Sequence, residues 1–179
     1  SPALSLGSAV HEVVEGLAKY KAEERINVPM LEQFENVWPK FTGKKGGFSS
    51  ESEEKETKER GITMLKRVKD NISPLLDKIV KLKDGKGGML PNYLLSPEEN
   101  IILCGKIDWL RYIPEDDSIH ILDFKTGVNE ESEESLQLPI YQLLLKNLQK
   151  RKVSGASYWY LNNDNNPKQV ELPDIDESF

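Results

Sequence analysis

The sequence of 179 residues contains very little cysteine and histidine. Cys104 is the single cysteine, so the chain can form no internal disulfide and no cysteine-ligated zinc or iron–sulfur cluster. Because Cys104 ends a short apolar strand pattern, we expect it to be a small core residue. The only histidines are His11 and His120. A serine hydrolase would need one of them as its base, and no Gly-x-Ser-x-Gly elbow accompanies them.

Other common signatures are also missing. The chain has neither a Gly-x-x-x-x-Gly-Lys-Ser/Thr phosphate loop nor a Gly-x-Gly-x-x-Gly dinucleotide turn. No run approaches the roughly 18 apolar residues of a membrane span, and no signal peptide opens the chain. We therefore expect a cytoplasmic protein without a membrane partner. The net charge of −6 argues against a surface that coats nucleic acid broadly, but it leaves room for a local basic groove.

The apolar periodicity predicts an α/β chain in the order helix, three strands, helix, strand. Helices are predicted at residues 4–24, 56–83 and 134–149, and strands near residues 89–95, 101–112, 118–124 and 155–161, with an edge strand at 168–172. At this length we expect a single domain over residues 1–179. Glycine and charge concentrate in residues 43–60, which predicts a mobile charged loop that leads into a charged helix start.

The most informative segment is residues 105–127. Two runs rich in β-branched residues flank a Pro/Asp turn, which predicts an antiparallel hairpin. With the turn centred at Glu115-Asp116, Asp108 falls opposite Asp123, and strand alternation puts Lys125 on the Asp123 face. Two carboxylates about 5 Å apart repel each other unless a cation lies between them. The pattern therefore predicts a site for a hard divalent cation.

The first predicted helix carries Gly7, His11 and Glu15 on one narrow stripe, because each step of four residues turns only about 40°. The stripe borders the apolar side of the helix, so His11 can face the sheet and complete a carboxylate site. A lone helical histidine is more often structural or exposed. Glu15 could orient His11, bind the metal directly, or be a solvated helix charge.

The last predicted helix carries Gln137 and Tyr141 one turn apart and ends in the basic run 146–152. Glutamine can hydrogen-bond a phosphate and a tyrosine ring can pack on a sugar or base, although pairs at this spacing are usually structural. The basic run could follow a phosphate backbone or complement the helix dipole. His120 alternates onto the strand face opposite Asp123, so we expect it to be structural.

Taken together, these motifs resemble the RecB-like branch of the PD-(D/E)xK nuclease superfamily. In chain order they are Gly7-x-x-x-His11-x-x-x-Glu15, Gly105-x-x-Asp108, Asp123-Phe124-Lys125-Thr126-Gly127 and Gln137-x-x-x-Tyr141. The resemblance implies a restriction-endonuclease-like core, in which a mixed β-sheet flanked by helices carries the site in the order α-β-β-β-α-β. It also implies metal-dependent cleavage of phosphodiester bonds in DNA.

The resemblance further implies a role for each matching residue. His11, Asp108 and Asp123 would be ligands of Mg²⁺ or Mn²⁺, with the backbone carbonyl of Phe124 completing the shell. Asp108, Asp123 and Lys125 would form the catalytic set. Lys125 would position or activate the attacking water and stabilise charge on the phosphorane. A metal-bound water is a suitable nucleophile because the metal lowers its pKa.

Gln137 and Tyr141 match a family motif on the substrate side of the site, and Glu15 matches a position that could support the ligands. Some relatives hold an iron–sulfur cluster through four cysteines, which this chain cannot do. We expect a nuclease domain excised from a longer helicase–nuclease or recombination protein. DNA would be its substrate, a helicase domain or subunit a possible partner, and an exonuclease is favoured over an endonuclease. The alternative is a non-catalytic DNA-binding or scaffolding module on the same fold.

Overall fold

The computed structural model describes residues 1–175, in which helices come first and a mixed β-sheet follows. The helices are α1 (Pro2–Gly16), α2 (Met30–Val37), α3 (Glu51–Asp70) and α4 (Gln137–Leu148). The strands are β1 (Asn92–Ser96), β2 (Ile101–Cys104), β3 (Trp109–Ile113), β4 (Ser118–Lys125), β5 (Val153–Tyr160) and β6 (Lys168–Val170). This mixed α/β architecture confirms the predicted fold class.

The chain forms two compact units that are interleaved in sequence. The first comprises residues 1–77, 124–130 and 158–168, and the second comprises residues 78–123, 131–157 and the chain from residue 169. Strands β4 and β5 each pass from the second unit into the first. The expectation of a single domain over residues 1–179 stays a prediction.

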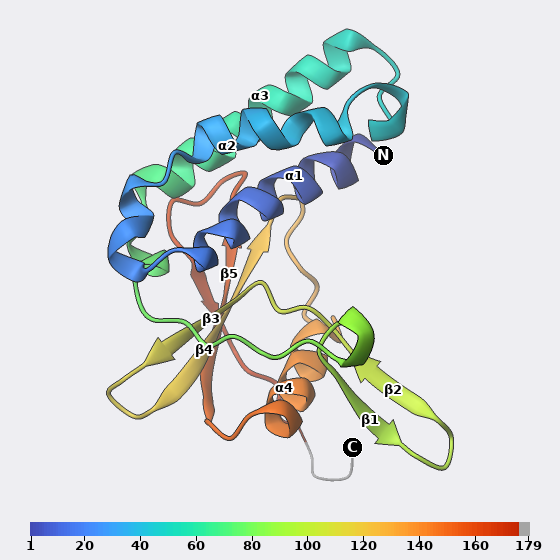
Figure 1. Ribbon diagram of the computed structural model, residues 1–179, viewed down its shortest axis with the longest axis vertical. Coiled ribbons are helices and arrows are strands. Elements are labelled where there is room, and N and C mark those ends of the chain that lie inside the picture. The colour runs from blue at the N-terminus through green and yellow to red at the C-terminus, as the bar shows by residue number, and fades with distance from the viewer. Residues whose placement is uncertain (176–179) are drawn as a thin grey trace. The chain divides into compact units, whose positions relative to one another are not determined.

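In the first unit, α1, α2 and α3 pack against one another (Figure 1). Gly61 of α3 marks their closest approach, because a Cβ atom there would lie 2.6 Å from the Phe34 ring and 3.1 Å from Leu6. These helices bury most of the apolar residues of their facing sides. The fully buried members include Leu6, Val10, Val14, Phe34, Leu65 and Val68.

A buried arginine ties together the segments that follow α1 and α3. Arg25 is 3% exposed, and its guanidinium donates hydrogen bonds to the carbonyls of Leu17, Tyr20, Leu75 and Asp77 at 2.8–3.2 Å. Burial lowers the pKa of this guanidinium. Four carbonyl acceptors supply the hydrogen bonds that a buried charge requires, so Arg25 holds these turns in place.

Strands β3 and β4 form the predicted antiparallel hairpin. Trp109 pairs with Leu122, and each later pair keeps the same constant sum of residue numbers. Asp108 lies one residue before the first of these pairs, so its predicted opposition to Asp123 stays an extrapolation of this register. The predicted register of the hairpin is therefore confirmed over the paired residues.

The larger sheet has the order β3-β4-β5-β6. Near the start of both central strands the Ile119 amide donates to the Lys152 carbonyl, and near their end the Leu161 amide donates to the Lys125 carbonyl, each at 2.9 Å. Strands β4 and β5 therefore run parallel, with α4 in the crossover between them. Strand β4 thus has antiparallel β3 on one side and parallel β5 on the other, so the sheet is mixed.

In the second unit, β1 and β2 form a separate antiparallel ribbon beside α4 (Figure 1). Both strands carry exposed apolar residues, among them Leu94 and Ile102. Cys104 is also exposed, so the expectation that it is a core residue is wrong. A two-stranded ribbon leaves much of its surface uncovered, which an apolar strand pattern alone does not reveal.

Several predicted boundaries need correction. The first helix ends at Gly16, and the helix predicted over residues 56–83 runs from Glu51 to Asp70. It ends before Pro74, which lies in a short 3₁₀ turn. Helix α2 was not predicted, and the strand expected over residues 101–112 is divided into β2 and β3.

The segment 43–60 is not the loop that its composition predicted. Residues 43–46 form a 3₁₀ turn, and residues 51–60 belong to α3. The Ser50 side chain caps this helix by accepting a hydrogen bond from the Glu53 amide at 3.1 Å. Acidic residues in the first turn also complement the helix dipole. The charged stretch is thus a helix start.

Candidate active site

In the first unit, the Gly7–His11 stripe of α1 lies against the end of β4. A Cβ atom on Gly7 would lie 3.1 Å from the Thr126 hydroxyl oxygen, so glycine allows the helix to approach closely. The His11 ring meets the Phe124 ring edge-on, with 6.2 Å between their centroids. The helix motif and the Asp-Phe-Lys-Thr-Gly motif are therefore neighbours, as the amphipathic pattern of α1 predicted.

Glu15 lies one helical turn beyond His11 and contacts its imidazole. The distance from His11 Nδ1 to Glu15 Oε2 is 2.8 Å, and both side chains are partly buried. A carboxylate that accepts a hydrogen bond from Nδ1–H favours the tautomer in which Nε2 is unprotonated, and an unprotonated Nε2 can bind a metal. This contact supports orientation of His11 by Glu15, and direct binding of a metal by the Glu15 carboxylate stays open.

Asp123 is a buried carboxylate near the end of β4. It is 2% exposed, and Gln137 Nε2 lies 3.4 Å from its Oδ1 in the second unit. Along the strand, Asp123 and Lys125 share one face, while Phe124 points to the other. There the Phe124 ring packs against Trp159 at 6.2 Å. At the end of β4 the alternation thus puts Asp123 and Lys125 on one side of the strand and the packed Phe124 ring on the other.

Asp108 immediately precedes β3 and is half-buried. Both aspartates belong to the second unit, and continuation of the β3–β4 register by one residue would set this carboxylate opposite Asp123. Facing carboxylates of this kind suit a hard divalent cation, which prefers oxygen ligands. The local pairing therefore agrees with the acidic part of the predicted metal site.

Gln137 and Tyr141 form a hydrogen-bonded chain on one side of α4. Gln137 Nε2 donates to the Tyr141 hydroxyl at 3.0 Å, and that hydroxyl donates to the Lys106 carbonyl at 3.1 Å. Tyr141 is only 8% exposed. Its ring offers little surface for stacking on a substrate, so the structure places Tyr141 as a support for Gln137. The substrate-side role of the pair stays a prediction.

Lys125 has an aromatic neighbour that the sequence analysis did not identify. Its ammonium nitrogen lies over the Tyr158 ring, 4.9 Å from the centroid. Tyr158 is buried and meets Tyr160 edge-on at 6.1 Å. The alternation of Tyr158 and Tyr160 in β5 was the available signal, because residues two apart in a strand share a face.

His120 lies away from these residues, as expected. Its Nε2 is 2.7 Å from the Ser157 hydroxyl, and a Cβ atom on Gly155 would lie 2.8 Å from its ring. Burial lowers the His120 pKa, and the nearby charge of Arg111 lowers it further. These contacts support a structural role.

The donor chemistry of the predicted ligands fits magnesium or manganese. Asp108 and Asp123 offer carboxylate oxygens in the second unit, and His11 offers an imidazole oriented by Glu15 in the first. Along the chain, Asp123 is followed directly by Phe124, whose ring contacts the His11 ring. The residues present therefore suit a divalent metal.

The mixed sheet and the Asp123-Phe124-Lys125 sequence that ends β4 are the features that point to a class of protein. A family model of the PD-(D/E)XK nuclease superfamily matches residues 1–178. The chain belongs to the PD-(D/E)XK nuclease superfamily. Membership implies a phosphodiester hydrolase that acts on nucleic acid, typically with a divalent metal. No curated protein and no solved structure matches the chain. Within the described residues, no helix is both long and apolar enough to span a membrane.

Proposed function

We propose that this chain is a Mg²⁺- or Mn²⁺-dependent deoxyribonuclease domain of the RecB-like branch. It hydrolyses phosphodiester bonds of DNA as an exonuclease in recombination or repair, and a helicase domain or subunit is its expected partner. One observation supports the proposal most: Asp123-Phe124-Lys125 ends β4, and the β3–β4 register begins with Trp109 opposite Leu122, so that one further step would set Asp108 opposite Asp123. Superfamily membership supports the same chemistry.

His11, Asp108 and Asp123 would hold the metal, with the Phe124 carbonyl as a further oxygen ligand. When bound, the metal supplies a water of lowered pKa and neutralises charge that develops on the phosphate. Glu15 would keep the His11 ring in its ligating orientation, in keeping with their 2.8 Å contact.

Lys125 and Gln137 have roles that do not require them to bind the metal. The Lys125 ammonium would orient the attacking water by hydrogen bonding and stabilise negative charge on the phosphorane oxygens. The Gln137 amide would restrain the Asp123 carboxylate, from which it lies 3.4 Å. Tyr141 would hold that amide in place.

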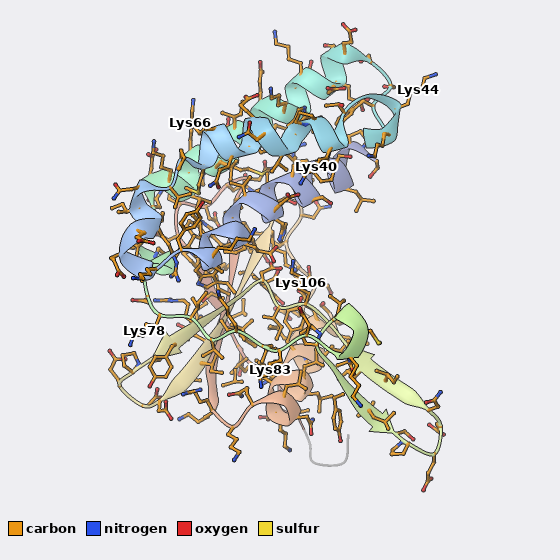
Figure 2. The ribbon with its side chains drawn as sticks, in the orientation of Figure 1. Lys40, Lys44, Lys66, Lys78, Lys83 and Lys106 are labelled. Atoms are coloured by element: carbon orange, nitrogen blue, oxygen red, sulfur yellow. The ribbon has the colours of Figure 1, made fainter. Side chains whose placement is uncertain are left out.

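Cleavage of linear DNA in Mn²⁺ tests the proposal. Asp123→Ala and Lys125→Ala should each abolish turnover, while circular dichroism and thermal unfolding show an intact fold. Matched controls are Asp84→Ala and Lys83→Ala, because both residues are exposed in the segment that precedes β1 (Figure 2 labels Lys83). These controls should cleave at the wild-type rate.

Two other outcomes are informative. If Asp123→Ala and Lys125→Ala cleave as fast as the wild type, the assigned site is wrong. If the wild type binds Mn²⁺ and DNA but cleaves no linear or circular DNA, single- or double-stranded, the non-catalytic DNA-binding module becomes the better assignment. The retained Asp108, Asp123 and Lys125 set argues against that module, since an inactive site has no need of all three.

A further inference from the structure

A basic pocket lies where α4 ends and β5 begins, within the second unit. Its volume is about 460 Å³. The residues that give it its chemical character are four cations and two amides: Lys146, Lys150, Arg151, Lys152, Gln142 and Gln149. The metal site proposed above uses none of them.

The pocket carries more positive charge than its acidic neighbours neutralise. Arg151 Nε lies 3.0 Å from Asp117, and Lys152 Nζ lies 3.7 Å from Asp116. Lys146 and Lys150 are exposed and form no ion pair with any residue in the described part of the chain. Two cations thus remain for an anionic ligand.

Side chains hold the backbone of the pocket in one conformation. The Arg151 amide donates to Gln149 Oε1 at 2.6 Å, and Gln149 Nε2 donates back to the Arg151 carbonyl at 2.6 Å. The Arg151 guanidinium also lies over the Tyr112 ring, 5.3 Å from its centroid. Ordering Arg151 before a ligand arrives lowers the entropy that binding costs.

Gln142 adds a polar group that lacks a partner. Its Oε1 is buried, and among the described residues none forms a hydrogen bond with it. Buried polar atoms in folded proteins nearly always have partners, so an exception points to a missing ligand or water. The buried position of this atom keeps it out of reach of an external phosphate, so the case for anion binding depends on the basic side chains.

The distance along α4 between Gln137 and Lys146 determines which part of a DNA substrate the pocket could reach. Gln137 begins this helix beside Asp123, and Lys146 follows nine residues later, about 13 Å along the axis and on the opposite side. Along DNA this distance corresponds to about four nucleotides. Lys146 therefore cannot contact the phosphate that is cleaved near Asp123.

We propose that this pocket binds the phosphate backbone of the DNA several nucleotides away from the cleaved bond. The inference rests on the proposed function for its choice of ligand. The cations exceed what the dipole of a short helix requires. Lysines without an acidic partner suit repeated phosphate oxygens, which accept hydrogen bonds and carry charge. The pocket would thus increase affinity for long substrates.

Equilibrium binding of a labelled oligonucleotide of about 20 nucleotides, longer than one binding site, tests this proposal. The whole chain is used with Asp123→Ala present and a chelator added, so that binding is measured without cleavage. The test variant is Lys146→Glu/Lys150→Glu. The matched control is Lys66→Glu/Lys69→Glu, two exposed lysines at the end of α3 (Figure 2 labels Lys66). Both variants reverse two charges near a helix C-terminus.

The test variant should bind the oligonucleotide at least about tenfold more weakly than the control at low salt. In a plot of the logarithm of the binding constant against the logarithm of the salt concentration, its slope should be shallower by about one to two. In the background with Asp123 intact, cleavage of a dinucleotide should stay unchanged. Equal binding by the test and control variants overturns the proposal, and so does a parent chain that binds no oligonucleotide. Weaker binding by the test variant in a chain that never cleaves supports the pocket and refutes the nuclease assignment instead.

Discussion

The Lys125 ammonium lies over the face of the Tyr158 ring, with Nζ 4.9 Å from the ring centroid. The ring face carries partial negative charge, and such a contact contributes about 0.5–2 kcal/mol, more where water is excluded. Tyr158 is itself held by burial and by its edge-on contact with Tyr160. The relationship therefore assigns Tyr158 as a positioning residue for the lysine of the proposed catalytic set.

Substitution of Tyr158 separates the ring from its hydroxyl group. Tyr158→Phe keeps the ring face and should retain turnover within about twofold, whereas Tyr158→Leu should lower kcat about tenfold, equivalent to about 1.4 kcal/mol. Tyr160→Leu is the control for loss of a buried aromatic residue beside it. Steady-state cleavage rates and thermal unfolding should be measured for all three. Equal losses of kcat in Tyr158→Phe and Tyr158→Leu contradict a role for the ring face.

Loss of the Glu15 carboxylate should weaken metal binding through His11. Glu15→Gln removes the charge that holds His11 Nδ1 at 2.8 Å, and Mn²⁺ affinity should fall at least about tenfold by calorimetry. Glu12→Gln is the control on the same helix, because Glu12 pairs with Lys40 at the surface. If both variants bind Mn²⁺ like the wild type, Glu15 does not orient a ligand.

Removal of the Tyr141 hydroxyl should affect catalysis more than substrate binding. Tyr141→Phe breaks the link between the Gln137 amide and the Lys106 carbonyl, at a cost of about 1 kcal/mol in the free energy of unfolding. Because the ring is buried, KM for DNA should change little while kcat falls. Urea unfolding and initial rates check both quantities. A raised KM with unchanged kcat would instead place Tyr141 on the substrate.

His120 should make the protein less stable in acid. Burial and Arg111 lower its pKa in the folded state below the ordinary value of 6.5. As the pH falls through that value, the unfolded chain binds a proton that the folded chain does not, so the free energy of unfolding decreases. His120→Asn should flatten this dependence between about pH 7 and about pH 5 in urea unfolding. Identical slopes for variant and wild type would show that another group is responsible.

Local rules were sufficient for the hairpin and for the stripe on α1. The turn centre and strand alternation determine which residues of β3 and β4 face each other, so the register was predictable without knowledge of any distant contact. Helical spacing likewise predicted that Glu15 lies one turn from His11 on the same side of the helix, where the two side chains are in contact. Both predictions depend on residues close in sequence, where backbone geometry leaves few alternatives.

Local composition was misleading where capping or solvent exposure decided the structure. The charged stretch before residue 60 looked like a loop, yet Ser50 caps a helix there and the acidic residues favour its N-terminus. Cys104 looked like a core residue because its neighbours are apolar, yet it lies on an exposed ribbon. Hydrophobic pattern alone does not say whether another element covers a strand.

The sequence by itself determined the order of the motifs, the register of the β3–β4 hairpin, and membership of a nuclease superfamily. Tertiary structure alone decided that Tyr158 lies under Lys125, that Tyr141 is buried behind Gln137, and that Arg25 binds carbonyls some 50 residues away. The physical reason is separation along the chain. Helical and strand periodicity relate residues within a few positions, whereas burial and hydrogen-bond partners depend on which distant segments meet when the chain folds.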